Sequence, residues 1–263
     1  MSIYLEFAKQ AFRQRFIYRL NAYMMIVSSF LGLLILISVW KALYAGKTEV
    51  NGITYENMLQ FLVLNMAIQS LIRSRIGQKI GERVENGAIS LDLIRPITLK
   101  GYFLADQIGE NVFGFLFSTL PAAAAAALLW GFAVPGEPFR FPLFVISLLL
   151  GIALMNQINY LFGLLAIWLK TAFFINFITG AVISLFAGSF VPLWFYPEPL
   201  YKISLLLPFH LVSFQPIAIY LGKKTLTEAG LIIGGQLVWM LLLLGLEKWM
   251  WRRAQTHIDV FGG

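Results

Sequence analysis

The residues that could carry chemistry are few, and nucleotide binding is the first activity to test. The sequence AGKT at 45–48 resembles the end of a phosphate-binding loop. Such a loop needs a small residue five positions before its last Gly, where this chain has Lys41. The sequence GKKT at 222–225 is no better a match. We therefore expect no nucleotide site in this chain.

Metal, thiol and hydrolase chemistry are equally poorly supported. The chain has no cysteine, and its two histidines, His210 and His257, cannot by themselves form a metal centre. It contains neither an HExxH pair nor a GxSxG nucleophile motif. We expect no catalytic residue, no metal site and no bound cofactor.

Two groups of polar residues remain as candidates. Asp106 and Glu110 are four residues apart, which places them on one helix face. We expect them at the start of a helix, where the N-terminus stabilises negative charge, so a structural role is favoured over catalysis. Asn156, Gln157 and Asn159 cluster in the middle of an apolar stretch. These three amides could line a substrate pathway, or they could join neighbouring membrane helices through hydrogen bonds.

The composition shows what kind of protein must position these residues. Of 263 residues, 59% are hydrophobic and 13% charged, against about 45–50% and about 25% in soluble domains. Stretches long enough to cross a bilayer as helices lack every charged residue: Asn21–Trp40, Asn57–Ile72, Asn111–Gly136, Phe141–Leu169, Thr171–Pro197, Ile203–Gly222 and Ala229–Leu246. We predict an all-α membrane protein.

The basic residues predict its orientation. They are dense before the first apolar stretch and in the segment 73–100, which places both in the cytoplasm by the positive-inside rule. The segment Ile203–Gly222 could be a seventh span, but Pro208 and Pro216 interrupt it. We favour six spans, with an outer re-entrant hairpin in region 192–228 before the last span and both termini in the cytoplasm.

The first twenty residues have an amphipathic pattern. Leu5, Ala8, Phe12 and Phe16 recur at helical spacing, and charged residues occupy another face. We predict a helix over 1–20 that lies along the cytoplasmic leaflet; the alternative is a solvated helical extension.

The segment Ile76–Ile97 alternates apolar residues with charged ones. Its apolar side chains could pack on a partner, whereas an ordinary solvated loop has little use for them. Gly87 can end a first short helix in the left-handed conformation, and Pro96 ends the next.

Two motifs resemble those of a known family, the membrane subunits of type-2 ABC transporters, in particular the bacterial branch with six spans. The first motif is RVENGAISLDLIRP at 83–96, similar to the inner loop of the family. The second is AGSFVPLWFYP at 187–197, followed by Leu207-Pro208-Phe209 and Phe214-Gln215-Pro216, similar to its fifth span and outer hairpin. Ala88-Ile89-Ser90 departs from the acidic residue that many relatives carry here.

The resemblance implies a single transmembrane domain over 1–263 that acts as the permease of an exporter in a bacterial inner membrane. Two copies of a cytoplasmic ABC ATPase would bind ATP and Mg, and a second permease chain, identical or homologous, would complete a dimer. Membrane lipids are further expected partners, and nucleic acid is not. The resemblance implies ATPase coupling through Ile80, Arg83, Glu85, Gly87, Leu91, Asp92, Arg95 and Pro96.

On the outer side of the membrane, we expect a gate through which the cargo leaves. Its residues are Gly188, Phe190, Pro192, Trp194, Pro197, Pro208, Phe209 and Pro216, for which an interfacial aromatic belt is the alternative. Uncharged spans predict a hydrophobic or amphipathic cargo, and multidrug efflux is one activity found in the family. A membrane-embedded lipid-modifying enzyme and a gated channel are the alternative functions.

Overall fold

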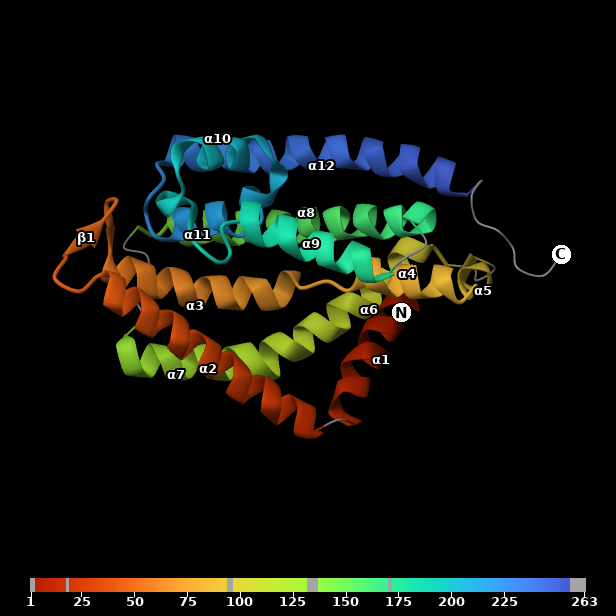
Figure 1. Ribbon diagram of the computed structural model, residues 1–263, viewed down its shortest axis with the longest axis horizontal. Coiled ribbons are helices and arrows are strands. Elements are labelled where there is room, and N and C mark those ends of the chain that lie inside the picture. The colour runs from red at the N-terminus through yellow and green to blue at the C-terminus, as the bar shows by residue number, and fades with distance from the viewer. Residues whose placement is uncertain (1–2, 18, 94–96, 132–136, 170–171, 256–263) are drawn as a thin grey trace.

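The computed structural model is built almost wholly from helices (Figure 1). It describes residues 3–17, 19–93, 97–131, 137–169 and 172–255. The only strands in these ranges form one antiparallel hairpin, β1 (Glu49–Val50) and β2 (Ile53–Thr54). The expected all-α membrane class is confirmed.

The helices before the middle of the chain are α1 (Ile3–Ile17), α2 (Arg19–Leu43), α3 (Tyr55–Ile72), α4 (Ile76–Glu85), α5 (Ile89–Leu93), α6 (Leu99–Gly114), a π-helical turn (Phe115–Thr119) and α7 (Leu120–Trp130). The later helices are α8 (Arg140–Leu169), α9 (Ala172–Phe186), α10 (Glu198–Leu206), α11 (Phe214–Tyr220) and α12 (Leu226–Ala254). Two 3₁₀ turns, Leu193–Phe195 and Pro208–Leu211, flank α10.

Four helical stretches in the described residues are long and apolar enough to cross a membrane. They are Tyr23–Leu43, Leu99–Trp130, Arg140–Leu169 and Leu226–Ala254. Two more predicted spans are helical but are not in this group. The amide side chains of α3 lower its mean hydropathy, and α9 is short. The total of six spans stays a prediction.

The helix that contains the start of the third uncharged run, Asn111–Gly136, begins before that run. The run begins at Asn111, but the helix begins at Leu99, where the hydroxyl of Thr98 accepts a hydrogen bond from the Gly101 amide. Pro121 has no N–H to donate to the preceding turn, and Leu120 N–H instead bonds to the Phe115 carbonyl five residues back. This wider bonding pattern produces the π-helical turn between α6 and α7.

α8 lies at the centre of the molecule, with α4, α9, α11 and α12 packed against it. Two glycines of α8 permit this close packing. A Cβ atom added to Gly151 would lie 2.6 Å from the Val212 carbonyl oxygen, and one added to Gly163 would lie 2.7 Å from the Ile80 side chain. Small residues allow close helix contacts in membranes, where apolar burial against lipid gives little driving force.

The segment Ile203–Gly222 is not a single helix. α10 ends at Leu206, because Leu207 precedes Pro208 and takes the extended conformation that this position favours. A 3₁₀ turn and the short, buried α11 follow. Whether this broken segment re-enters the membrane stays a prediction.

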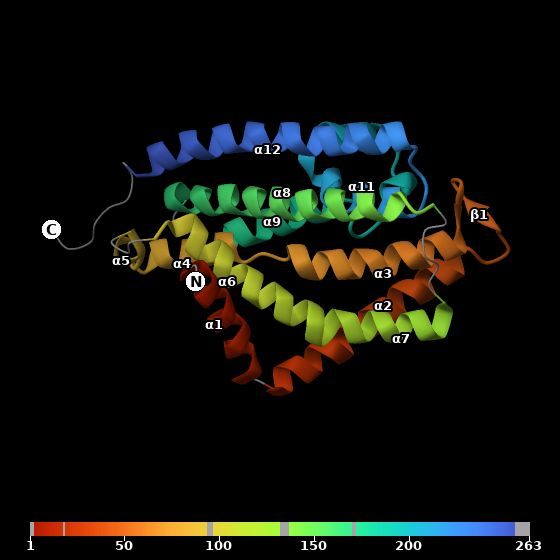
Figure 2. The same ribbon diagram turned by 180° about the vertical axis from the view of Figure 1, so that it is seen from behind.

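The two ends of the molecule differ in their elements. The start of α1, helices α4 and α5 and the last turns of α12 lie at one end, here called the α4–α5 end (Figure 1, Figure 2). The β1–β2 hairpin lies at the opposite end, here called the β1–β2 end.

Candidate functional site

Helix α4 is attached to the core by its apolar face. Ile76 and Ile80 are fully buried, and Ile80 contacts α8 at Gly163. Ile80, one of the predicted ATPase-coupling residues, therefore connects α4 to α8 within this chain, and its part in coupling stays a prediction. Val84 is partly buried, and Ile89 in α5 is buried as well.

The turn between α4 and α5 takes the conformation that its glycine predicts. Gly87 has φ +74°, which confirms the expected left-handed residue after the helix. The Asn86 side chain accepts a hydrogen bond from the Ala88 amide, and the Ser90 hydroxyl donates to the Gly87 carbonyl. The two short helices therefore meet at a hydrogen-bonded corner.

An ion pair closes this corner. Arg83 Nη1 lies 3.2 Å and 3.1 Å from the two carboxylate oxygens of Asp92, whose residue is only 2% exposed. Between them, Leu91 points outward with 64% of its surface exposed, and Glu85 is exposed too. Arg95 and Pro96, also expected here, lie outside the described residues.

Asp106 and Glu110 are joined to cations of other helices. Lys79 of α4 pairs with Asp106 and lies 3.3 Å from Glu110, which is also 2.8 Å from Arg15 of α1. Because α6 begins at Leu99, both carboxylates lie in the helix interior, so the expected stabilisation by a helix N-terminus is wrong. Their structural role is to link α1, α4 and α6.

α1 packs along α6 through backbone contact and aromatic rings. A Cβ atom at Gly109 would lie 2.1 Å from the carbonyl oxygen of Ala8. Phe12 packs edge-on against Phe113, with ring centroids 5.6 Å apart. Leu5, by contrast, is exposed. Part of the predicted apolar face is thus used within the protein, and the placement of α1 on a membrane surface stays a prediction.

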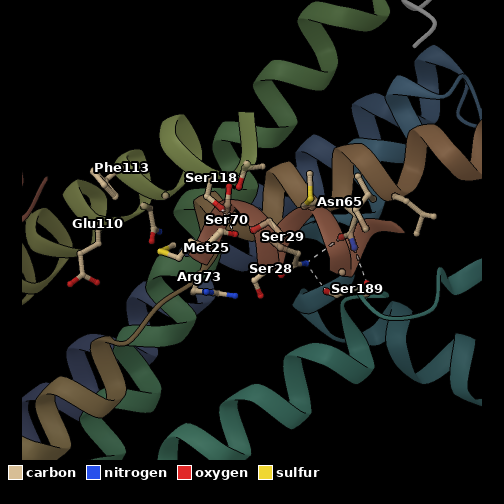
Figure 3. A pocket seen from close by; sticks show the side chains of 18 of the residues that line it. Met25, Ser28, Ser29, Asn65, Ser70, Arg73, Glu110, Phe113, Ser118 and Ser189 are labelled. Atoms are coloured by element: carbon tan, nitrogen blue, oxygen red, sulfur yellow. Dashed lines mark hydrogen bonds between the residues drawn. The ribbon is translucent and has the colours of Figure 1, made fainter. Parts of the chain in front are cut away.

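A cavity of about 570 Å³ lies between α2, α3, α6 and the π-helical turn (Figure 3). Its apolar lining includes Met25, Leu33, Leu62, Met66 and Phe113, and its hydroxyl groups include those of Ser28, Ser29, Ser118 and Thr119.

One end of this cavity is basic. Arg15, Arg73 and Arg75 line it there together with Glu110. Arg73 and Arg75 belong to the short connection between α3 and α4, and both are exposed. The cavity therefore begins at the connection that leads to α4.

The other end reaches the predicted outer gate. Asn65 donates to the Ser189 carbonyl at 2.8 Å, and Gln69 donates to the Ser189 hydroxyl at 2.7 Å. Phe190, exposed, lines the cavity beside Ser189. The segment after α9 is thus fastened to α3 across the cavity.

The remaining gate residues build the cap over this segment. Gly188 has φ +67°, and Trp194 packs on Phe214 with ring centroids 4.7 Å apart. Phe209 is buried. Pro192, Pro197 and Pro208 precede or begin short helical turns, and Pro216 is buried in α11. All eight residues belong to the segment that connects α9 to α12.

The predicted pathway amides lie elsewhere. Gln157 donates to the Met240 carbonyl of α12, and Asn159 is buried; neither these two nor Asn156 lines the cavity. Sequence reasoning missed the serines of α2. Ser28, Ser29 and Gly32 share a helix face, and this spacing was the available signal.

A comparison with protein families finds one match, to a family described as ABC-2 family transporter protein, over residues 30–258. Neither the curated proteins nor the solved structures contain a match to the chain. The matched region includes α4, α5, the cap and most of the residues that line the cavity, although Arg15, Met25, Ser28 and Ser29 precede it.

Proposed function

The chain belongs to the ABC-2 family of transporter proteins, and from this membership we propose that it is the permease of an ATP-driven exporter. It would act with a separate cytoplasmic ABC ATPase, which binds the ATP and Mg. The observation that carries the proposal is the α4–α5 corner: exposed at Leu91 and firmly attached to the core behind it.

This attachment suits the transmission of force. If the ATPase moves α4, the contact of Ile80 with Gly163 carries the motion to α8. The pairs of Lys79 with Asp106 and Glu110 carry it to α6. Packed helices move as rigid bodies rather than deforming continuously, so α4 and its neighbours would shift together.

The cavity supports a pathway along α3. Its lining residues on α3 run from Leu62 to Ser70, about 12 Å of helix at 1.5 Å per residue, and Arg73 follows the end of α3. Phe190 lines its far end. We propose that cargo passes along this cavity and leaves past the Gly188–Pro216 cap, which acts as the outer gate.

The proposed assembly contains two permease chains, identical or homologous, and two ATPase subunits. The α4–α5 end would face the cytoplasm of a bacterial cell and the β1–β2 end the outside. The start of α1 and the last turns of α12 share one end, as an even number of crossings requires (Figure 1). We therefore retain six spans, with α10 and α11 in an outer re-entrant hairpin.

A lipid-modifying enzyme is less well supported. Its candidate carboxylates, Asp106 and Glu110, are both held in ion pairs between helices. No comparable observation favours a gated channel.

Co-purification tests the proposal. The tagged chain is purified from its own cells in mild detergent, the ABC ATPase is identified by mass spectrometry, and ATP hydrolysis by the complex is measured. Leu91→Asp is expected to reduce the bound ATPase roughly tenfold, the effect of losing one strong contact residue. The matched control is Leu226→Asp, because Leu226 is 61% exposed at the β1–β2 end.

The two variants give clear outcomes. Loss of the ATPase in the Leu91 variant alone supports docking at the α4–α5 corner. Equal retention in both variants contradicts docking there, and a chain that transports without any ATPase contradicts the exporter function itself.

A further inference from the structure

The basic end of the cavity contains two guanidinium groups that no other group among the described residues neutralises. Within the described part of the chain, the Arg73 and Arg75 side chains make no ion pair and no hydrogen bond. Arg15, the third cation of the lining, is paired with Glu110. Three cations against one carboxylate leave this end of the cavity with a surplus of positive charge.

The backbone that carries these two arginines is held in place. Gln107 accepts a hydrogen bond from the Arg75 amide at 2.7 Å and donates to Asn111 at 2.8 Å. Asn111 in turn donates to the Leu71 carbonyl at 2.7 Å. Both amides are buried, so α6 fixes the short connection from both sides. A fixed backbone lowers the conformational cost of binding a ligand at its side chains.

Beyond the arginines, the lining combines hydroxyl and amide groups with apolar side chains. The Ser29 and Ser118 hydroxyls bond to each other at 2.8 Å, and Ser118 also donates to the Met25 carbonyl. Leu33, Leu36 and Met66 supply apolar surface further along the cavity. Figure 3 shows Arg73 and the serine side chains around the same space.

From this arrangement we infer that the cavity binds an amphipathic molecule whose head is a phosphate-like oxyanion. Arg73 and Arg75 bind the head, because planar guanidinium groups offer paired donors to phosphate oxygens. The apolar lining takes the tail. This inference rests on the proposed function and specifies its cargo, since the cavity is the proposed pathway.

Binding of a defined probe tests the inference without transport. The full chain, with the subunit that accompanies it, is placed in phosphatidylcholine nanodiscs. Dodecyl phosphate with a dansyl group at the end of its tail is titrated, and dansyl emission is corrected with empty discs. The double variant Arg73→Gln/Arg75→Gln is expected to bind about tenfold more weakly or worse, because it loses charge-assisted hydrogen bonds.

Three further variants control for folding and for charge. Lys248→Gln/Arg252→Gln removes the same two positive charges from exposed residues of α12 outside the cavity and is expected to bind normally. Arg73→Lys/Arg75→Lys keeps the charge but loses the paired donors, so an intermediate affinity is expected. Gly32→Leu adds a side chain where a Cβ atom meets nothing within 4 Å, so it fills the cavity and weakens binding without a backbone clash.

Competitors identify the chemistry of the ligand. Unlabelled dodecyl phosphate is expected to displace the probe, whereas dodecyl maltoside and inorganic phosphate are not. Competition by the maltoside overturns the role of the anionic head, and equal competition by inorganic phosphate overturns the role of the tail. Weaker probe binding in discs that contain phosphatidylglycerol identifies a lipid headgroup as the source of the oxyanion; unchanged binding identifies a free amphipath.

The failures of the two proposals are distinguishable. If the probe does not bind while the ATPase still co-purifies, the ligand class is wrong and the exporter function stands. If Arg73→Gln/Arg75→Gln and Lys248→Gln/Arg252→Gln weaken binding equally, the effect is one of overall charge and the assignment to Arg73 and Arg75 is wrong.

Discussion

The ion pair between Arg83 and Asp92 gives the sharpest prediction on the α4–α5 corner. Replacing Arg83 with Gln removes a guanidinium group that pairs with the carboxylate of Asp92, a residue only 2% exposed. Breaking a fully buried pair costs about 3–5 kcal/mol, and an exposed pair contributes about 0–1 kcal/mol. The Arg83 side chain is about one-third exposed, so we expect the corner to lose about 2–3 kcal/mol.

A single cysteine can report this loss, because the chain contains no cysteine of its own. Ile89 is 3% exposed inside the corner, so an Ile89→Cys thiol reacts with a maleimide only when the corner opens. A loss of 2–3 kcal/mol corresponds to labelling roughly 30–150 times faster, at tenfold per 1.4 kcal/mol. Quenching the maleimide reaction at timed intervals, followed by mass spectrometry, measures this rate.

A double-mutant cycle separates the ion pair from other effects. Asp92→Asn removes the buried charge and is expected to cost about 1 kcal/mol. The double variant Arg83→Gln/Asp92→Asn is expected to label more slowly than the Arg83 variant alone, because two amides can bond to each other and no buried charge remains. The reasoning is refuted if the rate increase in the double variant equals the product of the increases in the two single variants. An unchanged labelling rate in Arg83→Gln refutes it as well.

Two further predictions concern helix packing and topology. Gly109→Ala forces a methyl group toward the Ala8 carbonyl oxygen, 2.1 Å away, and is expected to lower the free energy of unfolding by about 2–3 kcal/mol. Gly32→Ala, which meets open space, serves as its control in thermal unfolding. Lys223→Cys is expected to react with an impermeant maleimide on intact cells, whereas Arg252→Cys reacts only after permeabilisation. Protection of the cysteine at position 223 would favour a seventh span.

Most of the helical architecture could be predicted from apolar runs and prolines. The break at Pro208 and the left-handed Gly87 follow from local backbone chemistry, which a sequence displays directly. The start of α6 could not be predicted in this way, because the charges of Asp106 and Glu110 placed the start of the uncharged run at Asn111, twelve residues after the helix begins. Their cations, on α1 and α4, lie far away in the sequence, and only the folded chain brings them together.

The cavity was harder to predict than the α4–α5 corner. The corner is one continuous segment, so its charges and apolar residues are visible together. The cavity is assembled from α2, α3, α6 and the segment after α9, and each contributes a few uncharged side chains. The cluster of Asn156, Gln157 and Asn159 drew attention because it is dense in sequence, yet Gln157 joins α8 to α12. Density along a chain does not indicate which polar groups share a space.

The packing of α1 on α6 also has a consequence for how the chain is made. Tyr4 and Thr98, which bond to each other, are 94 residues apart. At about 5–20 residues per second, a ribosome needs roughly 5–20 s to synthesise the intervening chain. During that time α1 has no α6 to cover Ala8 and Phe12. We expect the nascent helix to lie on the bilayer surface until α6 is inserted. The amphipathic pattern of the first twenty residues would then act during biogenesis as well as in the folded protein.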